Sequence, residues 1–259
     1  VRNSLAPKSG KLSVTANNVS LRTKDELSLT LSPDIQFTVK DFADFDTFKA
    51  SGNIDIAEAK YKKNFDDGSS NFIRDQILSL FIDSRKRVDT YSPSFLRKYP
   101  FLSKINLDLG IFAENSISVD VKIATAVVML ELSSQLKIGG TVKDFAPTGI
   151  FSINSGIFNL RGNDFEFQNG AQVAFNGSLD GKIDITATTE ISTSSDAFSA
   201  VTGNTDLDRR KRISTSNANA SSDLYSITLT VGGTVFRPVW SFDSSPYLTD
   251  TNVYALILT

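Results

Sequence analysis

Neither cysteine nor histidine occurs among the 259 residues of this chain. Without thiols, the chain forms no disulfide bond, no cysteine-type zinc site and no cysteine nucleophile. Without imidazoles, it lacks the usual general base and the commonest metal ligand. Pairs of carboxylates can still run glycoside hydrolysis, but the 29 acidic residues are spread along the chain without a distinguishing motif. The sequence therefore predicts a protein that is not an enzyme and that uses no cofactor or metal.

An excess of positive charge is also missing. The formal net charge is −2 and the sequence pI is about 5.3, whereas nucleic-acid-binding domains usually carry a strongly basic face. We therefore expect no nucleic-acid partner. Two short basic clusters, 85–87 and 209–212, are most simply explained as the end of a helix and a solvated loop, and contact with anionic lipid headgroups is the alternative.

Long apolar runs are absent as well. A helix that spans a bilayer needs about 18 to 20 apolar residues, and the stretch 124–132 is too short and contains Thr125 and Glu131. The chain begins at Val1 and ends within the apolar stretch 254–259. We therefore expect it to be a piece of a longer protein.

The chain does contain a series of segments in which apolar residues occupy every second position, with Gly or Asn between the segments. Alternation with period two is typical of strands that are buried on one face only. The sequence therefore predicts a mainly β protein in which a long sheet has one apolar and one polar face. The clearest segments contain Leu107, Leu109 and Ile111; Ile117, Val119, Val121 and Ile123; Leu130, Leu132, Leu136 and Ile138; Ile183, Ile185, Ala187 and Ile191; and Tyr225, Ile227, Leu229 and Val231.

The first hundred residues combine similar strands with one predicted helix. Strands are expected over 11–21, 27–31, 35–40 and 53–61, with a turn at 32–34, a loop with one helical turn over 41–50 and a break at 51–52. An amphipathic helix is expected over about 71–86. Its simplest role is a lid or plug on the apolar face, and the alternative is a helix that binds a membrane surface or a partner. The following segment is expected to be irregular until Leu102 because of Pro93 and Pro100.

The glycines of the second half lie at expected strand ends or bulges, and none of them fits a phosphate-binding loop. The segment 192–223 is rich in Ser, Thr, Asn and Asp and predicts a long polar loop. We divide the chain into a β-rich segment (1–62), a helical or irregular insertion (63–104) and a β domain (105–259). All three are expected to belong to one continuous β structure.

Two stretches carry a family resemblance. Residues 136–177 contain, in order, a strand that ends in G-x-hydrophobic before a proline, then G-x-hydrophobic-x-hydrophobic, and then F-x-hydrophobic before a further strand. Residues 227–258 contain a strand, G-x-hydrophobic followed by a proline, a second strand, and an apolar helix capped by Thr249 or Asp250. The order and spacing of these motifs resemble the C-terminal domain of TamB-type translocation and assembly modules.

The resemblance implies a place among the AsmA-like and bridge-like lipid transfer proteins. It implies an inner-membrane anchor in a preceding segment, a location in the periplasm of a diderm bacterium, and a C-terminal region that faces the outer membrane. It also implies an elongated, rolled (taco-like), antiparallel-rich sheet with an apolar concave groove and one or two short amphipathic helices. The implied partners are phospholipids and an outer-membrane β-barrel assembly protein of the Omp85 type.

Two functions follow from this resemblance. The first is a groove that passes phospholipid acyl chains between the two membranes, because apolar burial holds hydrocarbon without specific polar contacts. The second is a structural or chaperone-like module that docks the assembly partner by strand addition at a sheet edge. Without the resemblance, the apolar positions would be read as the sealed core of a sandwich or barrel. The predicted groove residues are Leu107, Leu109, Ile111, Val119, Val121, Ile123, Leu130, Leu132, Leu136, Ile138, Phe151, Ile153, Phe165, Phe167, Val173, Phe175, Ile183, Ile185, Ile191, Ile227, Leu229 and Val231.

Overall fold

A computed structural model describes residues 8–22, 26–42, 44–65, 99–123, 126–194 and 222–258. These residues form one 12-stranded sheet with the strand order β1-β3-β4-β5-β6-β7-β8-β10-β11-β12. Outside this path, β2 pairs with β3, and β9 pairs with β7 and β10. The strands are β1 (Gly10–Thr15), β2 (Val19–Arg22), β3 (Leu27–Val39), β4 (Phe48–Phe65), β5 (Asn106–Ile123), β6 (Ala126–Gly140), β7 (Phe145–Leu160), β8 (Asn163–Phe167), β9 (Gln172–Asn176), β10 (Lys182–Ser194), β11 (Ser222–Thr234) and β12 (Arg237–Ser245). The helical elements are the 3₁₀ turns η1 (Phe45–Thr47) and η2 (Pro100–Lys104), and the helix α6 (Asp250–Leu258).

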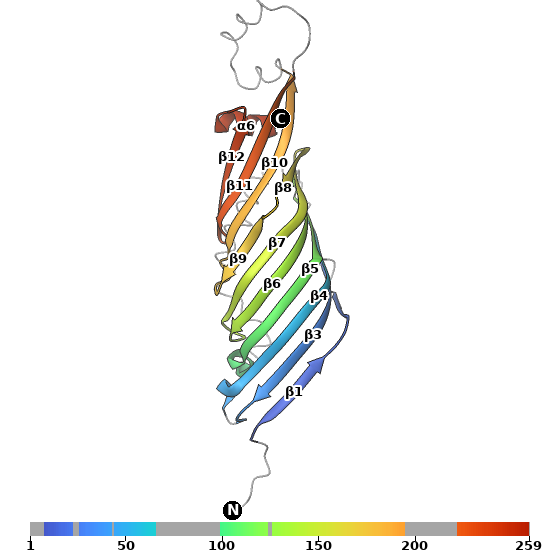
Figure 1. Ribbon diagram of the computed structural model, residues 1–259, viewed down its shortest axis with the longest axis vertical. Helices are drawn as coiled ribbons and strands as arrows, with labels where there is room; N and C mark the ends of the chain where they lie inside the picture. Colours follow the sequence, from blue (N-terminus) through green and yellow to red (C-terminus); the bar gives the residue numbers. More distant parts are fainter. Residues whose placement is uncertain are drawn as a thin grey trace, which may run out of the picture.

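The sheet is elongated because its strands are stacked across the long axis of the molecule, with β1 near one end and β12 near the other (Figure 1). Neighbouring strands are antiparallel except for β4 and β5, which are parallel. A parallel pair needs a crossover of about a dozen residues or more, and the chain between β4 and η2 is long enough for one. The prediction of a mainly β, antiparallel-rich sheet is confirmed. The path is open, so β1 and β12 lie at opposite edges.

The predicted turn at 32–34 is wrong, because β3 runs without interruption through Pro33. Proline lacks the N–H group that a strand ladder uses. On one side, Pro33 pairs with Ile54 of β4. On the other side, it lies opposite the gap between β1 and β2, where its carbonyl oxygen accepts a hydrogen bond from the N–H of Ala16 (3.0 Å). That gap also divides the predicted strand 11–21 into two, with Asn18 at a positive φ of 53°.

Several other strands are longer than the sequence predicts. The predicted break at 51–52 is wrong, because β4 begins at Phe48 and continues through Gly52 to Phe65. The 3₁₀ turn η1 matches the helical turn expected within 41–50. The predicted helix at 71–86 lies outside the described residues. The ends of the predicted polar loop belong to strands, since β10 continues to Ser194 and β11 begins at Ser222. The predicted C-terminal helix is confirmed as α6, and the carbonyl oxygen of Thr249 accepts hydrogen bonds from its first turn.

Irregular pairings lie side by side across β4, β5, β6 and β7. The register shifts between Ile56 and Ala59, between Ala113 and Ile117, and again where β6 meets β7. Polar side chains join these bulges. The hydroxyl of Ser133 accepts hydrogen bonds from the Asn115 N–H (3.0 Å) and the Asn154 side-chain amide (2.6 Å). This row of bulges bends each strand locally while the strands on both sides stay paired.

Gly149 shows how closely the backbones approach within the sheet. Its φ is +118°, and a Cβ atom built on it would lie 2.0 Å from the carbonyl oxygen of Gln135. Such a conformation is disfavoured for any residue with a side chain, and the contact is with backbone that cannot move aside. Glycine at this position therefore allows β6 and β7 to pair closely where Gly149 lies opposite Leu136.

We expect Gly149→Ala to lower the free energy of unfolding by about 2–3 kcal/mol, because the new methyl group adds backbone strain and a collision. Gly232→Ala is the matched control, since a Cβ atom at Gly232 would meet nothing within 4 Å, and its effect should stay below about 1 kcal/mol. Urea denaturation followed by circular dichroism measures both. Equal loss of stability in the two variants would contradict this explanation.

Candidate apolar binding face

The register places the apolar positions of successive strands next to one another. Residues paired across neighbouring strands share a face of the sheet. One row starts at Ile54 in β4 and passes through Ile111, Leu136 and Gly149 to Phe175 in β9. The alternation within each strand places most of the other apolar positions on the same side. A single apolar face therefore extends across the sheet from β1 to β12.

The predicted groove residues whose side chains the structure describes fall on this face. In β5 and β6, Leu109 pairs with Ile138 and Val119 with Leu130, and β6 continues to β7 through the pairing of Leu132 with Ile153. Leu107 and Val121 lie on the same side of β5, and Ile123 pairs with Ala126 through its backbone. The other pairings are Phe151 with Val173, Val173 with Ile183, Phe158 with Phe165, Phe167 with Ala187, Ile185 with Val231, Ala187 with Leu229, Thr189 with Ile227, and Ile191 with Tyr225.

The predicted set of groove residues does not include any residue of the first four strands. Leu12 of β1 pairs with Phe37 of β3, and Leu31 of β3 pairs with Ile56 of β4, so these residues extend the apolar face toward the β1 edge. The alternation in these strands was visible in the sequence. The sequence does not show the pairing of β4 with β5, which joins β1–β4 to the rest of the sheet, because these two strands are far apart in the chain.

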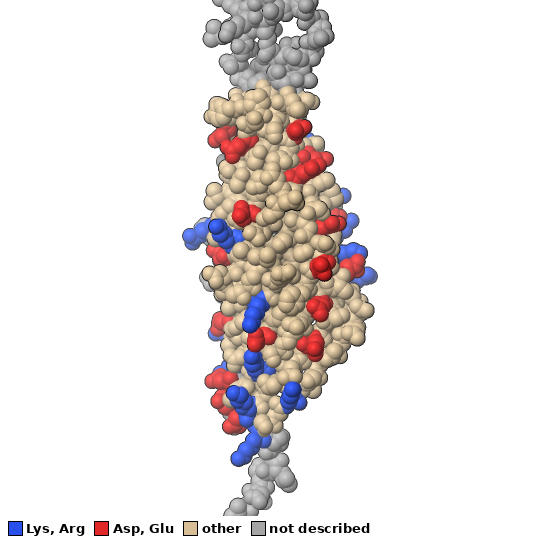
Figure 2. All heavy atoms as spheres, viewed as in Figure 1, with Lys and Arg blue, Asp and Glu red and all other residues tan. Residues whose placement is uncertain are grey.

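The opposite face is polar and carries ion pairs between neighbouring strands. The carboxylate of Asp108 in β5 lies 2.7 Å from Lys49 Nζ of β4 and 3.1 Å from Lys137 Nζ of β6. Hydrogen bonds from Lys49 and then from Lys137 lower the pKa of Asp108 below its usual value. Charged side chains of both signs are spread over the side of the molecule seen in Figure 2, with most Lys and Arg toward the β1 end.

Two shallow depressions also lie on the polar face. The first is bordered by Asn53, Asp108 and Lys137, and the second by Asp120, Glu131 and Glu166. No group of His, Cys, Asp or Glu side chains in the described part of the chain is arranged to hold a metal ion. We therefore take the apolar face as the candidate site.

The apolar face is most open at the β1 edge. Leu12 and Leu21 are exposed to 61% and 53%, and Val14, Leu27 and Phe37 are also exposed. Isolated surface hydrophobic residues are common, but a contiguous apolar patch usually marks a binding surface. Charge on this face is rare and compensated, since Lys63 of β4 lies 3.1 Å from Glu26. Around this edge, the protein offers apolar surface that remains in contact with solvent.

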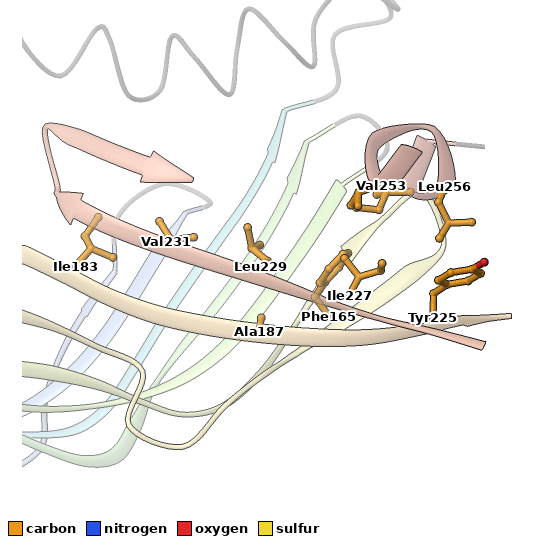
Figure 3. Packing of buried hydrophobic residues seen from close by; sticks show 10 residues of the cluster. Phe165, Ile183, Ala187, Tyr225, Ile227, Leu229, Val231, Val253 and Leu256 are labelled. Carbon is orange, nitrogen blue, oxygen red and sulfur yellow. The ribbon is translucent and has the colours of Figure 1, made fainter. Parts of the chain in front are cut away.

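The other end of the same face is covered by α6. Three helix residues, Val253, Leu256 and Ile257, are buried against β8, β10 and β11. Figure 3 shows Phe165, Ile227 and Tyr225 beneath the helix, and Leu229, Val231 and Ile183 farther along the same side of the sheet. The buried cluster consists of Phe165, Ile183, Ala187, Tyr225, Ile227, Leu229, Val231, Val253, Leu256 and Ile257. Five of the predicted groove residues, Phe165, Ile183, Ile227, Leu229 and Val231, are therefore packed against protein.

The comparison with protein families agrees with the motifs. The family model of the TamB C-terminal domain matches residues 2–259. The chain belongs to this family. A search of curated proteins found no match.

Membership of the TamB family suggests a role in the translocation and assembly module and implies a location in the bacterial envelope. The family is associated with outer-membrane assembly, which is consistent with a β-barrel assembly partner. Within the described residues of this TamB-type domain, no helix has the length and apolar character needed to cross a bilayer.

Proposed function

We propose that the apolar face is a conduit for phospholipid acyl chains in the periplasm, between the inner and the outer membrane. The observation that carries this proposal is the continuity of the face across the paired strands. Each methylene removed from water contributes about 0.8 kcal/mol, so acyl chains would bind without specific polar contacts. Lipid headgroups would stay in water beside the sheet.

The length of the face favours transport over storage of one lipid. The path contains ten strands, and neighbouring strands lie about 4.8 Å apart, so the face extends over roughly 43 Å. This length exceeds the hydrocarbon core of a bilayer, which is about 30 Å thick and holds two acyl chains end to end. On the part of the face that α6 does not cover, a lipid could therefore occupy several overlapping positions of similar burial. Moving between them would cost little free energy, which suits a conduit with low specificity for the lipid class.

The test is lipid content. The purified 259-residue chain should carry phospholipid that solvent extraction and mass spectrometry detect, and it should bind a fluorescent fatty-acid probe that such lipid displaces. A protein of equal size with a sealed core, purified in the same way, is the control. If the chain carries no extractable lipid and does not bind the probe, the proposed function is wrong.

A second function rests on the open edges. Among the described residues β12 is the last strand of the path, and an edge of this kind can pair with a strand of another protein. The partner would be an outer-membrane β-barrel assembly protein of the Omp85 type. A proline placed in β12, where the backbone N–H points to the free edge, should abolish capture of that purified partner. Capture that survives this change would count against strand addition. The two functions use different surfaces and are compatible.

A further inference from the structure

The helix α6 lies on the apolar face itself. Its residues Val253 and Leu256 lie over Phe165, Ile227 and Tyr225 (Figure 3), where Ile227 pairs with Thr189 and Tyr225 with Ile191. The same buried cluster continues through Leu229, Val231 and Ile183. On the other side of β10, Ile183 pairs with Val173 and Val173 with Phe151. The covered part is therefore continuous with the part of the face that α6 does not contact. The same rows of side chains run beneath the helix and beyond it.

The helix contacts the sheet through both polar and aromatic groups. Asn163 Nδ2 donates a hydrogen bond to the carbonyl oxygen of Ile257 (3.1 Å), and the rings of Tyr254 and Phe242 meet edge to face at 5.5 Å. The helix has nine residues, and a helix this short is only marginally stable by itself. Apolar burial of Val253, Leu256 and Ile257 therefore helps to keep α6 folded on the sheet.

We propose that the face beneath α6 is a second acyl-chain site, and that α6 is its displaceable occupant. This inference rests on the proposed function, because it requires that acyl chains occupy the neighbouring face. The surface that the helix covers is mostly hydrocarbon, and its polar groups are the Thr189 and Tyr225 hydroxyls and the Asn163 side chain that donates to Ile257. Such a surface does not distinguish the side chains of α6 from the methylenes of a lipid. A lipid that advances along the face can take the place of the helix and reach the β12 edge.

The experiment uses the full chain and a phosphatidylethanolamine that carries a diazirine in one acyl chain. After illumination, mass spectrometry of peptides locates the adducts on β5 and β6 and on β10 and β11. Ile257→Asp releases the helix by placing a carboxylate in its buried contact. Thr251→Asp is the matched control, because it adds the same charge at an exposed position of the same helix.

A second arm prevents release. In the double variant Phe242→Cys and Tyr254→Cys, the two thiols are the only ones in the chain and replace rings that are in contact. Dibromobimane then joins the helix to β12. The bridged and unbridged forms have the same sequence, so a difference between them does not reflect a folding defect caused by the substitutions.

We expect adducts on β5 and β6 in every protein. Adducts on β10 and β11 should be at least about fivefold more abundant in Ile257→Asp than in Thr251→Asp, and bridging should reduce them at least about fivefold. If β5 and β6 are labelled while the adducts on β10 and β11 change neither on release of α6 nor on bridging, the inference is wrong. The proposed acyl-chain conduit is not contradicted by that result. If β5 and β6 are not labelled in any protein, the proposed function fails and the inference fails with it.

Discussion

Leu132→Asp should weaken binding of an acyl probe by about a thousandfold at pH 7. Leu132 is half-buried in the middle of the apolar face, where it pairs with Ile117 and Ile153. A carboxylate next to hydrocarbon either stays ionised at a high cost or takes up a proton. Protonating an Asp with a pKa of about 3.9 at pH 7 costs about 4 kcal/mol, which corresponds to this loss in affinity.

The same reasoning predicts how the loss depends on pH. Below about pH 4 the carboxyl group is protonated without cost, so probe binding by Leu132→Asp should recover most of its strength. Leu132→Asn should show a smaller loss that does not change with pH. Gln135→Asp places the same charge on the exposed polar face of the same strand and should leave binding unchanged. Fluorescence titration between about pH 4 and pH 7 measures all three. A loss of binding in Gln135→Asp as large as in Leu132→Asp would show that the apolar face is not the binding surface.

Phe165→Ala should lower the free energy of unfolding by about 3–5 kcal/mol, the usual range for removing a buried aromatic ring. Phe165 has no exposed surface. Its ring lies 6.0 Å from that of Phe158 and 6.3 Å from that of Phe242, so its removal leaves a cavity between β7, β8 and β12.

Phe112→Ala is the matched control for this prediction. Phe112 is exposed to 43% and lies on the polar face of β5, opposite Gln135. The same substitution there should cost less than about 1 kcal/mol. Thermal and urea unfolding measure both variants. Similar losses would mean that the cluster beneath α6 is not the stabilising core of this part of the sheet.

The sequence predicts the faces of this sheet better than it predicts the strand ends. Alternation identifies which residues point to one side, because a pleated strand leaves no other arrangement. The family motifs add the order of the last strands and the helix that follows them. For this reason, the predicted groove residues between β5 and β11 share one face in the register.

What the sequence does not predict depends on neighbours that lie far away in the chain. Pro33 indicates a turn by its local chemistry, yet it lies in a strand because the adjacent edge is interrupted opposite it. Gly52 indicates a break, yet β4 continues through it, paired with Ile35 and Leu109. The covering of Ile227 and Leu229 by α6 is likewise a tertiary contact. The pattern of apolar residues in a sequence does not show whether protein or lipid covers them.

The row of bulges across β4 to β7 limits how this domain can change its length. In β4 the inward positions are even-numbered up to Ile56 and odd-numbered from Ala59, and in β7 they change from odd at Ile153 to even at Gly156. Deletion of one residue at such a point would restore plain alternation and keep the same side chains on the apolar face, whereas deletion of one residue elsewhere in the strand would turn the rest of the strand over and place its charged side chains on that face. Natural variants of this domain should therefore gain or lose single residues at these bulges or in the connections between strands, and elsewhere within the strands they should change length in pairs.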